Sequence, residues 1–510
     1  MKILTALLIS LPGLSCSSSN REATAQFNAL VPSKSLAPVK GYNLAQKAAV
    51  GKAVPAKFRQ NMELFSTEIE PLKDADPADE EAGTATVASS TFNLAKTILG
   101  AGILSLPGGI ARFSDSPSAL IPSYGLLAVM GLMSAYSFNS IGKACATHDV
   151  GSFAEAWAES VNKDQANWIN ALVSLKTFFA CLAYSIIIGD TFTQILASTN
   201  LNPALIGRSN VITGISAFIL FPLCLMKKLD ALKYTSLLGL LGTVYTLAFM
   251  IIRFFDGSYV EGGQFFGAIS ESLRPSFNVR TGPQSPFVIF VLISMISTAY
   301  VAHFNAPKFY AELKERTMKN YNKLVTAGFS VSIITYMIIA TVGFLQFGGN
   351  STGFVLNNYA TTDKLATLAR FSIGMGIVCG YPLTFSALRE GLFGLFNIQG
   401  KQRDTLLVPT TLAVLGLLTS LALVLTNLGT VVSFSGALIG SLLIYIVPAF
   451  MNIFNIRRKV GALIGQKRAP KGTVVSYSRG QKLEILINIL MAVAGATIAV
   501  IGVGINLVGV

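Results

Sequence analysis

Residues 89–109 form an apolar run that is long enough to enter a bilayer, yet glycine and proline interrupt it near its middle. Gly100 and Gly102 stand two residues apart, and Pro107 follows five residues later. Such residues free backbone N–H and C=O groups, which are tolerated in a membrane only where they line a cavity or are buried in protein. We therefore expect a helix that enters the membrane, unwinds between Gly100 and Gly102, and then resumes. A kinked helix whose glycines serve only packing is the alternative.

A second interruption of the same kind lies farther along the chain. The stretch from Phe287 is apolar as far as Ala302 and then meets His303, Phe304, Asn305 and Pro307. Broken hydrophobic segments at corresponding places in two halves of a chain indicate the binding site of a membrane transporter. The two interrupted stretches are the first and sixth apolar spans. Because both are broken, a binding site is favoured over simple helix packing.

The composition is typical of an all-α polytopic membrane protein, because 52% of the 510 residues are hydrophobic and only 13% are charged. The net charge of +14 lies mainly in short loops and does not indicate nucleic-acid binding. About eleven spans are expected, at 89–111, 119–142, 166–198, 211–226, 234–252, 286–307, 324–347, 367–388, 405–426, 428–456 and 483–508.

The loop charges predict the orientation of these spans. Alternate loops carry 21 Lys and Arg, whereas the opposite loops carry six. By the positive-inside rule the N-terminus lies on the basic side and the C-terminus on the other. The basic loops are 143–165, 227–233, 308–323, 389–404 and 457–482.

Two segments of different composition precede the transporter domain at 89–510. Residues 1–62 start with a short apolar run and continue with one acid against seven basic residues, which is the composition of a signal and transit presequence. A two-part presequence of this kind predicts targeting to a plastid envelope. A disordered cytosolic tail with a chance apolar start is the alternative. Residues 63–88 are acid-rich, and we expect a disordered, solvated linker there.

Ionisable residues within the expected spans include Lys96, Lys176, Asp190, His303 and Arg370. Lys96 lies one turn before Gly100, and the cost of a charge in lipid favours a function over snorkelling. His303 in the second break is either a proton relay or a hydrogen-bonded packing residue. Asp190 is expected to form a structural cap or ion pair, and Lys176 on the same span is four turns away, too far to pair with it. Arg370 is expected to anchor its span at the membrane interface.

The sequence predicts neither a metal site nor a bound cofactor, and nothing in it favours an enzyme. The five cysteines include no CxxC pair and mostly lie in or beside apolar spans, which argues against a disulfide framework. Only two histidines are present, and there is no P-loop or nucleophile elbow. Residues 150–164 carry apolar residues at helical spacing and form either a surface helix along the membrane or a plain loop.

Several motifs together resemble the amino acid/auxin permease family. No single motif is decisive, but their order and spacing are specific, and the similarity covers about residues 88–510. The resemblance implies a LeuT-like fold, in which two inverted repeats of five helices are followed by one further helix. It also implies amino acid substrates. The motifs are Phe92–Pro107, Tyr184–Asp190, Tyr310–Lys314, Tyr381–Arg389 and Ser435–Pro448.

The resemblance also implies a site. The backbone of the first break would bind the carboxylate of an amino acid, and carbonyls around the second break would take its ammonium group. Asn93 matches an asparagine linked with the ion in sodium-coupled relatives, whereas Lys96 stands where several relatives have Asn or Thr. Val378 and Gly380 replace expected hydroxyl residues, so Na⁺ is less expected than H⁺ as the coupling ion. The expected substrate-binding residues are Thr97, Gly100, Ala101, Gly102, Ile103, His303, Phe304 and Asn305, and the expected coupling residues are Asn93 and Lys96.

The resulting prediction is a secondary-active amino acid transporter that works by alternating access and is coupled to protons. An uncoupled amino acid facilitator is one alternative. A sensor that binds an amino acid without turnover, and signals through residues 63–88, is another. The expected location is an organelle membrane, with the plastid envelope favoured and the vacuolar or plasma membrane as alternatives.

Overall fold

The computed structural model describes residues 83–199, 206–226, 235–279, 285–465 and 477–508. Helices dominate this part of the chain, and strand pairing within it is limited to two isolated bridges. The α-helices are α3 (Val87–Ile98), α4 (Leu106–Phe113), α5 (Leu120–His148), α6 (Phe153–Ser160), α7 (Ala166–Ala197), α8 (Arg208–Ile215), α9 (Phe221–Leu225), α10 (Thr235–Phe255), α11 (Ile289–Tyr300), α12 (Ala306–Ala311), α13 (Met318–Phe347), α14 (Lys364–Leu395), α15 (Gly400–Val424), α16 (Leu428–Ser435), α17 (Val447–Gly465) and α18 (Arg479–Val508).

The described residues contain nine helices that are long and apolar enough to cross a membrane, or ten if the bent pair α3 and α4 is one span. The remaining expected span, 234–252, falls on α10, whose segment Leu241–Phe255 forms a shorter apolar helix. The predicted all-α polytopic fold is therefore confirmed, with a span count close to the expected eleven.

The first span is broken as the sequence predicts. Thr86 caps α3 by accepting a hydrogen bond from the amide of Ser89, and α3 ends at Ile98. Gly100 is extended, with φ −79° and ψ −173°, and a 3₁₀ turn, η4 (Ala101–Ser105), leads into α4. The two halves of the span meet at an angle of 44°.

The sixth span is broken in a matching way. Helix α11 ends at Tyr300, and Val301 leaves helical geometry with φ −73° and ψ 92°. The 3₁₀ turn η12 (His303–Asn305) follows, and α12 then begins with a proline in its first turn, where the missing N–H has no partner to lose. Both predicted interruptions thus exist as backbone breaks.

The broken sixth span packs tightly on the tenth. A π-helical segment, η14 (Gly436–Ile446), joins α16 to α17. A Cβ added at Gly436 would lie 1.7 Å from the carbonyl oxygen of Ser294 on α11, and one at Gly440 would lie 3.0 Å from the Cβ of Ser297. These glycines therefore permit close helix contact, which is the usual role of small residues between membrane helices.

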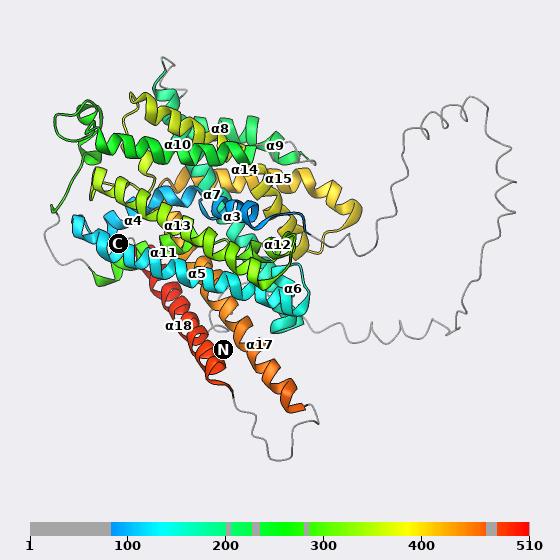
Figure 1. Cartoon of the computed structure of the whole chain (residues 1–510). Helices are drawn as coiled ribbons and strands as arrows, with labels where there is room; N and C mark the ends of the chain where they lie inside the picture. Colours follow the sequence, from blue (N-terminus) through cyan, green and yellow to red (C-terminus); the bar gives the residue numbers. More distant parts are fainter. Residues whose placement is uncertain (1–82, 200–205, 227–234, 280–284, 466–476, 509–510) are drawn as a thin grey trace, which may run out of the picture. The chain divides into compact units, whose positions relative to one another are not determined.

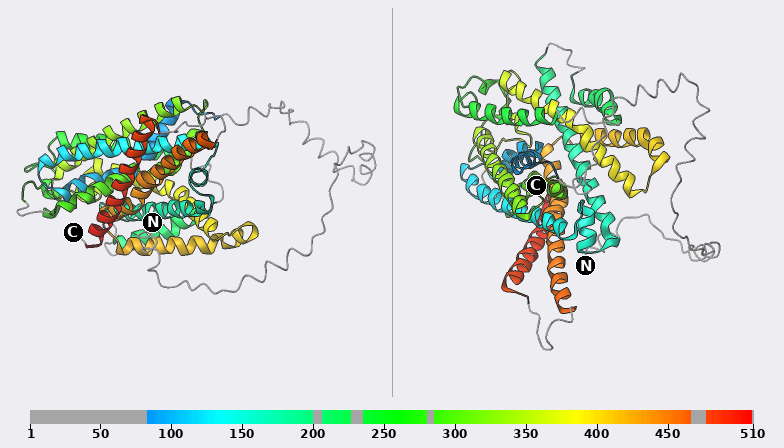
Figure 2. Two further views of the ribbon diagram at one scale, coloured as in Figure 1. Left: turned by 90° about the horizontal axis from the view of Figure 1, so that it is seen from below. Right: turned by 45° about the vertical axis from the view of Figure 1, so that its right-hand side comes forward.

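The broken first span lies among the other helices. Figure 1 shows α5, α10 and α13 running in much the same direction, and α3 packs directly against α13. In the right-hand view of Figure 2, α3 (blue) lies in the middle of the helical part, whereas α17 and α18 extend from one edge. The chain thus surrounds its first break with helices from both halves of the sequence.

The described part begins before the expected end of the acidic linker. Ala85 forms an isolated parallel bridge with Leu313, and its amide donates to the carbonyl of Glu312 at 2.9 Å. A Cβ on Gly83 would clash with the same backbone. Residues 83–88 are thus ordered beside the loop that follows α12. The rest of the linker, 63–82, and the predicted presequence, 1–62, lie outside the described residues.

The region 150–164 contains a helix rather than a plain loop. Ser152 and Glu155 form a capping box at the start of α6. Its apolar residues, including Trp157, are buried, and α6 packs against α5, α7 and α17. The expected surface helix therefore turns its apolar face toward neighbouring helices.

Candidate functional site

The two breaks meet at one small cavity with a volume of about 110 Å³. Thr97, Gly100 and Gly102 reach it from the first span, and Thr298, Ala299 and Val301 reach it from the sixth. Helices α7 and α16 complete the wall. Those two helices contribute Lys176, Phe179, Ala180, Ala183, Tyr184, Ile187, Leu428, Val431, Val432 and Ser435, and Ile98 completes the lining.

The glycines of the first break differ in what surrounds them. A Cβ at Gly100 would meet nothing within 4 Å, and one at Gly102 would have only an ordinary 3.8 Å contact with the Cα of Ala299. By contrast, a Cβ at Gly108 would clash with the carbonyl oxygen of Thr352, and one at Gly109 would lie 2.8 Å from the sulfur of Met295. Packing therefore explains the glycines of α4 but not those that face the cavity.

The helix ends at the breaks are held by one tyrosine. The hydroxyl of Tyr336 on α13 lies 2.6 Å from the carbonyl oxygen of Ile98 and 2.7 Å from that of Ala299. These carbonyls belong to the last turns of α3 and α11, where no intrahelical donor remains. On the other side of the first break, η4 runs directly into α4, and Gly102 in the first turn of η4 lines the cavity. The first N–H groups of a helix have no intrahelical acceptor and carry partial positive charge.

A lysine that the sequence analysis left without a role lies in the cavity wall. Lys176 lines the cavity, and its Nζ is 4.7 Å from the ring centroid of Phe304 in the sixth break. The cavity-lining residues of α7 follow a helical spacing of three and four, and apart from Lys176 and Tyr184 they are apolar. This spacing is the sequence signal that places Lys176 on the same face of α7 as the other lining residues. The sequence alone does not show which way that face points.

Several expected site residues lie away from the cavity. His303 is fully buried on the α5 side, where its Nε2 is 2.8 Å from Ser137 Oγ and 3.0 Å from the carbonyl oxygen of Ser134. Ile103 is buried in the apolar core. Asn305 stands at the start of α12, and Phe304 lies behind Lys176 rather than in the lining itself. The backbone of Ala101 opens η4 directly beside Gly100 and Gly102.

The expected coupling residues lie on α3, on the side of the break away from α4. Lys96 is half-buried, one turn before Gly100, and it makes neither an ion pair nor a hydrogen bond with any residue that the structure describes. The carbonyl of Asn93, one turn earlier, accepts a 2.8 Å hydrogen bond from the hydroxyl of Thr97. Neither side chain lines the cavity.

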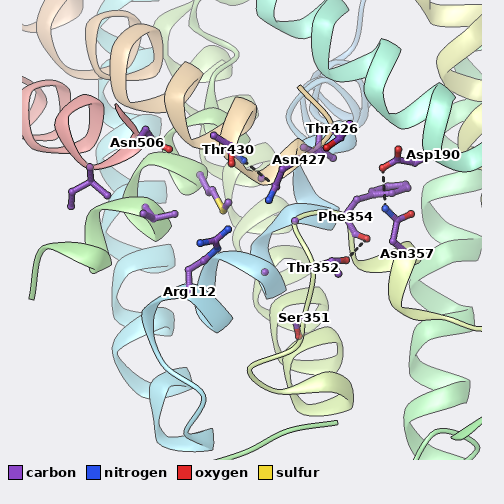
Figure 3. A pocket seen from close by; sticks show the side chains of 17 residues that line it. Arg112, Asp190, Ser351, Thr352, Phe354, Asn357, Thr426, Asn427, Thr430 and Asn506 are labelled. Carbon is purple, nitrogen blue, oxygen red and sulfur yellow. Dashed lines mark hydrogen bonds between the residues drawn. The ribbon is translucent and has the colours of Figure 1, made fainter. Parts of the chain in front are cut away.

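A larger, polar cavity of about 470 Å³ adjoins the small one and is referred to below as the vestibule. Leu428 lines both cavities. Figure 3 shows Arg112 from α4 and Asn427 pointing into the vestibule, and Asp190 facing Asn357 at its edge. The loops that line it, 348–363 and 425–427, are those assigned to the non-basic side by the loop charges. The vestibule is thus a polar space that shares a wall residue with the small cavity.

Asp190 and Arg370 have structural contacts. Asp190 forms the expected ion pair, accepting from Arg208 Nε at 2.7 Å. The expectation for Arg370 is wrong, because its side chain is 1% exposed instead of anchoring at the interface. It donates to the carbonyls of Leu356, Tyr359 and Ala360, which lie in the loop before α14. The backbone carbonyls of an irregular, buried loop need hydrogen-bond donors from elsewhere. The long side chain of Arg370 brings its guanidinium group within reach of three of them.

Comparison with known proteins gives consistent similarities. Residues 83–468 match the model of a family described as transmembrane amino acid transporter protein. The chain is 27% identical to vacuolar amino acid transporter 5 of Schizosaccharomyces pombe over 382 residues, which is 74% of this chain and 86% of that protein. It is 25% identical to sodium-coupled neutral amino acid transporter 7 of Mus musculus over 423 residues, 79% of this chain and 86% of that protein.

Among solved structures, the chain is similar to MhsT in complex with L-phenylalanine. The TM-score is 0.50 at 13% sequence identity, and the match covers 83% of this chain and 99% of that one. At that identity the likeness concerns the fold, and it agrees with the LeuT-like arrangement that the resemblance to the permease family implies.

Proposed function

The chain belongs to the transmembrane amino acid transporter family, and from that premise we propose a secondary-active transporter that moves amino acids by alternating access and is driven by protons. The observation that carries the proposal is the meeting of two backbone breaks at one cavity, with open space beside Gly100 and Gly102. Membrane transporters use such discontinuous helices to present backbone dipoles to their substrates.

The substrate carboxylate is placed at the first break. The N–H groups of Ala101 and Gly102 open the half-helix of η4 and α4, and helix N-termini attract negative charge. Glycine at position 102 lets a ligand approach this backbone closely. The hydroxyl of Thr97 and the backbone carbonyls around Thr298 and Val301 supply acceptors for the substrate ammonium group.

Coupling is assigned to Lys96 with Asn93. An ammonium held one turn from the break supplies the positive charge that a bound sodium ion supplies in sodium-coupled transporters. Its cost within a membrane is several kcal/mol, which calls for a functional reason. In α14, Val378 and Gly380 offer no side-chain oxygen to a sodium ion. Protons are therefore proposed as the coupling ion, although several of the similar proteins have sodium-coupled in their names.

The membrane proposed for this transporter is that of an organelle. Vacuolar transporters among the similar proteins favour the vacuolar membrane. The presequence predicted at 1–62 would direct the protein to a plastid envelope instead. A fluorescent fusion of the full-length chain, compared with one lacking residues 1–62, distinguishes the two, since only a plastid location requires that segment.

Uptake by the purified full-length protein in liposomes tests the proposed function. An imposed pH gradient should drive accumulation of radiolabelled amino acids, and replacement of sodium by choline should leave the rate unchanged. Uptake that equilibrates but never accumulates would support an uncoupled facilitator. Saturable binding without any uptake would support a sensor and refute transport.

A further inference from the structure

Among the residues that the structure describes, Lys176 is the one charged side chain that lines the small cavity. Its ammonium group contacts an aromatic ring: Nζ lies 4.7 Å from the ring centroid of Phe304. Within the described ranges of the chain it forms neither a salt bridge nor a hydrogen bond, and no Asp or Glu lines the cavity. The ammonium group therefore has three donors and no acceptor from the described protein.

The setting of Lys176 on α7 argues against simple snorkelling, because its side chain lines the cavity. It is ten residues from the first residue of α7, which places its Cα roughly 15 Å along the helix. Its ammonium group lies over the ring of Phe304 in the sixth break. A charge at such depth is costly unless it is paired, so charged residues within membrane spans are presumed to serve a function.

The cavity already offers groups for both ends of an amino acid backbone. The first break presents N–H donors for the carboxylate, and Thr97 with the carbonyls of the sixth break presents acceptors for the ammonium group. Lys176 comes from a third element, α7, and is separate from both breaks. It is therefore free to bind a further negative charge on the substrate, which an amino acid can carry only on its side chain.

We propose that Lys176 is a specificity-determining residue, and that the cavity takes amino acids with an anionic side chain. The side-chain carboxylate pairs with the Lys176 ammonium, against the face of Phe304. This inference rests on the proposed transport function and adds the substrate class. A neutral side chain of the same size would leave the ammonium unpaired and would bind less well, because discrimination is strongest where a buried polar group loses its partner.

The test compares L-glutamate with L-glutamine, which have nearly the same shape and differ in side-chain charge. Binding of each radiolabelled amino acid is measured on purified full-length protein in detergent, and uptake is measured in liposomes. The wild type should prefer glutamate by at least tenfold in both. Lys176→Met should lose glutamate affinity by tenfold or more while glutamine changes little, and Lys176→Arg should keep the preference. Lys163→Met is the matched control, since its side chain is 75% exposed and lies outside the cavity.

The outcomes separate this inference from the proposed function. If glutamate binding depends on Lys176 but no uptake occurs, the pairing of Lys176 with an anionic side chain would be supported. Transport would then be refuted. Uptake of neutral amino acids in preference to glutamate by the wild type would refute the inference and leave transport standing. The wild-type comparison needs no variant, so it decides the matter even if Lys176→Met fails to fold. If a folded Lys176→Met protein lost affinity for glutamate and glutamine equally, Lys176 would instead bind the α-carboxylate that all amino acids carry. That result would overturn the inference.

Discussion

Arg208 of α8 donates a 2.7 Å hydrogen bond from its Nε to Asp190 of α7. The other carboxylate oxygen of Asp190 accepts from the side-chain amide of Asn357 at 2.9 Å, and Arg208 also donates to the carbonyl of Ala422 at 2.9 Å. Both charged side chains are largely buried. This pair therefore fastens together α7, α8, α15 and the loop before α14 at the edge of the vestibule.

Asp190→Ala should destabilise the protein markedly, because it leaves a largely buried guanidinium without its counter-charge. Breaking such a pair costs on the order of 3 kcal/mol. Thermal unfolding of the purified protein in detergent should show a lower Tm, and Asp190→Ala with Arg208→Ala should lose less than the sum of the two single variants. Glu159→Gln, which removes an exposed pair with Lys163, should leave the Tm unchanged. An Asp190→Ala protein as stable as the wild type would contradict the structural role.

Tyr336→Phe should disturb the meeting point of the two breaks. Its hydroxyl holds the carbonyls of Ile98 and Ala299, and losing a buried hydrogen bond costs about 1–2 kcal/mol. The KM for uptake should rise as the two helix ends become less fixed, and the Tm should fall modestly. Tyr310→Phe removes an exposed hydroxyl that bonds to a loop carbonyl and serves as the control. An unchanged KM for Tyr336→Phe would show that the breaks are held without it.

Lys96→Asn should alter coupling. If the fixed ammonium replaces a bound sodium ion, wild-type uptake should respond to pH and ignore the exchange of sodium for choline. The variant should show a weaker pH response, because a neutral side chain replaces the tethered charge. Initial uptake rates across a pH series, with and without sodium, provide the measurement. A sodium requirement in the wild type would defeat this assignment, and an unchanged pH profile in the variant would make Lys96 a lysine that merely reaches the membrane surface.

The breaks of the first and sixth spans were predictable because glycine and proline act on the backbone locally. Gly100 and Pro307 interrupt helices wherever the rest of the chain lies, so the sequence indicates both the interruption and its place. Asp190 was also expected to form an ion pair, since a carboxylate in an apolar span requires a partner. These predictions depend on local chemistry, and the structure agrees with them.

Predictions that depended on the direction of a side chain succeeded less often. His303 lies in the sixth break as expected, but the 3₁₀ turn directs it toward Ser134 and Ser137 and not toward the cavity. Arg370 was expected at the interface, yet the loop folding back over α14 surrounds it. Lys176 had no assigned role because the sequence does not reveal that Phe304 and both breaks lie beside it. Rotation about a helix axis and loop paths are set by tertiary packing, which a single sequence does not show.

The most direct test of the account is exchange of a radiolabelled amino acid by liposomes that contain Gly102→Leu protein. The backbone at Gly102 faces the cavity without tight packing, so a leucine there should insert, fold and fill the space that the substrate needs. Gly125→Leu on α5 is the matched control, because a Cβ there would meet nothing within 4 Å and Gly125 does not line the cavity. We expect exchange in the wild type and in Gly125→Leu, and none in Gly102→Leu at equal reconstitution. Normal exchange by the Gly102→Leu protein would contradict the claim that substrate passes between the two breaks.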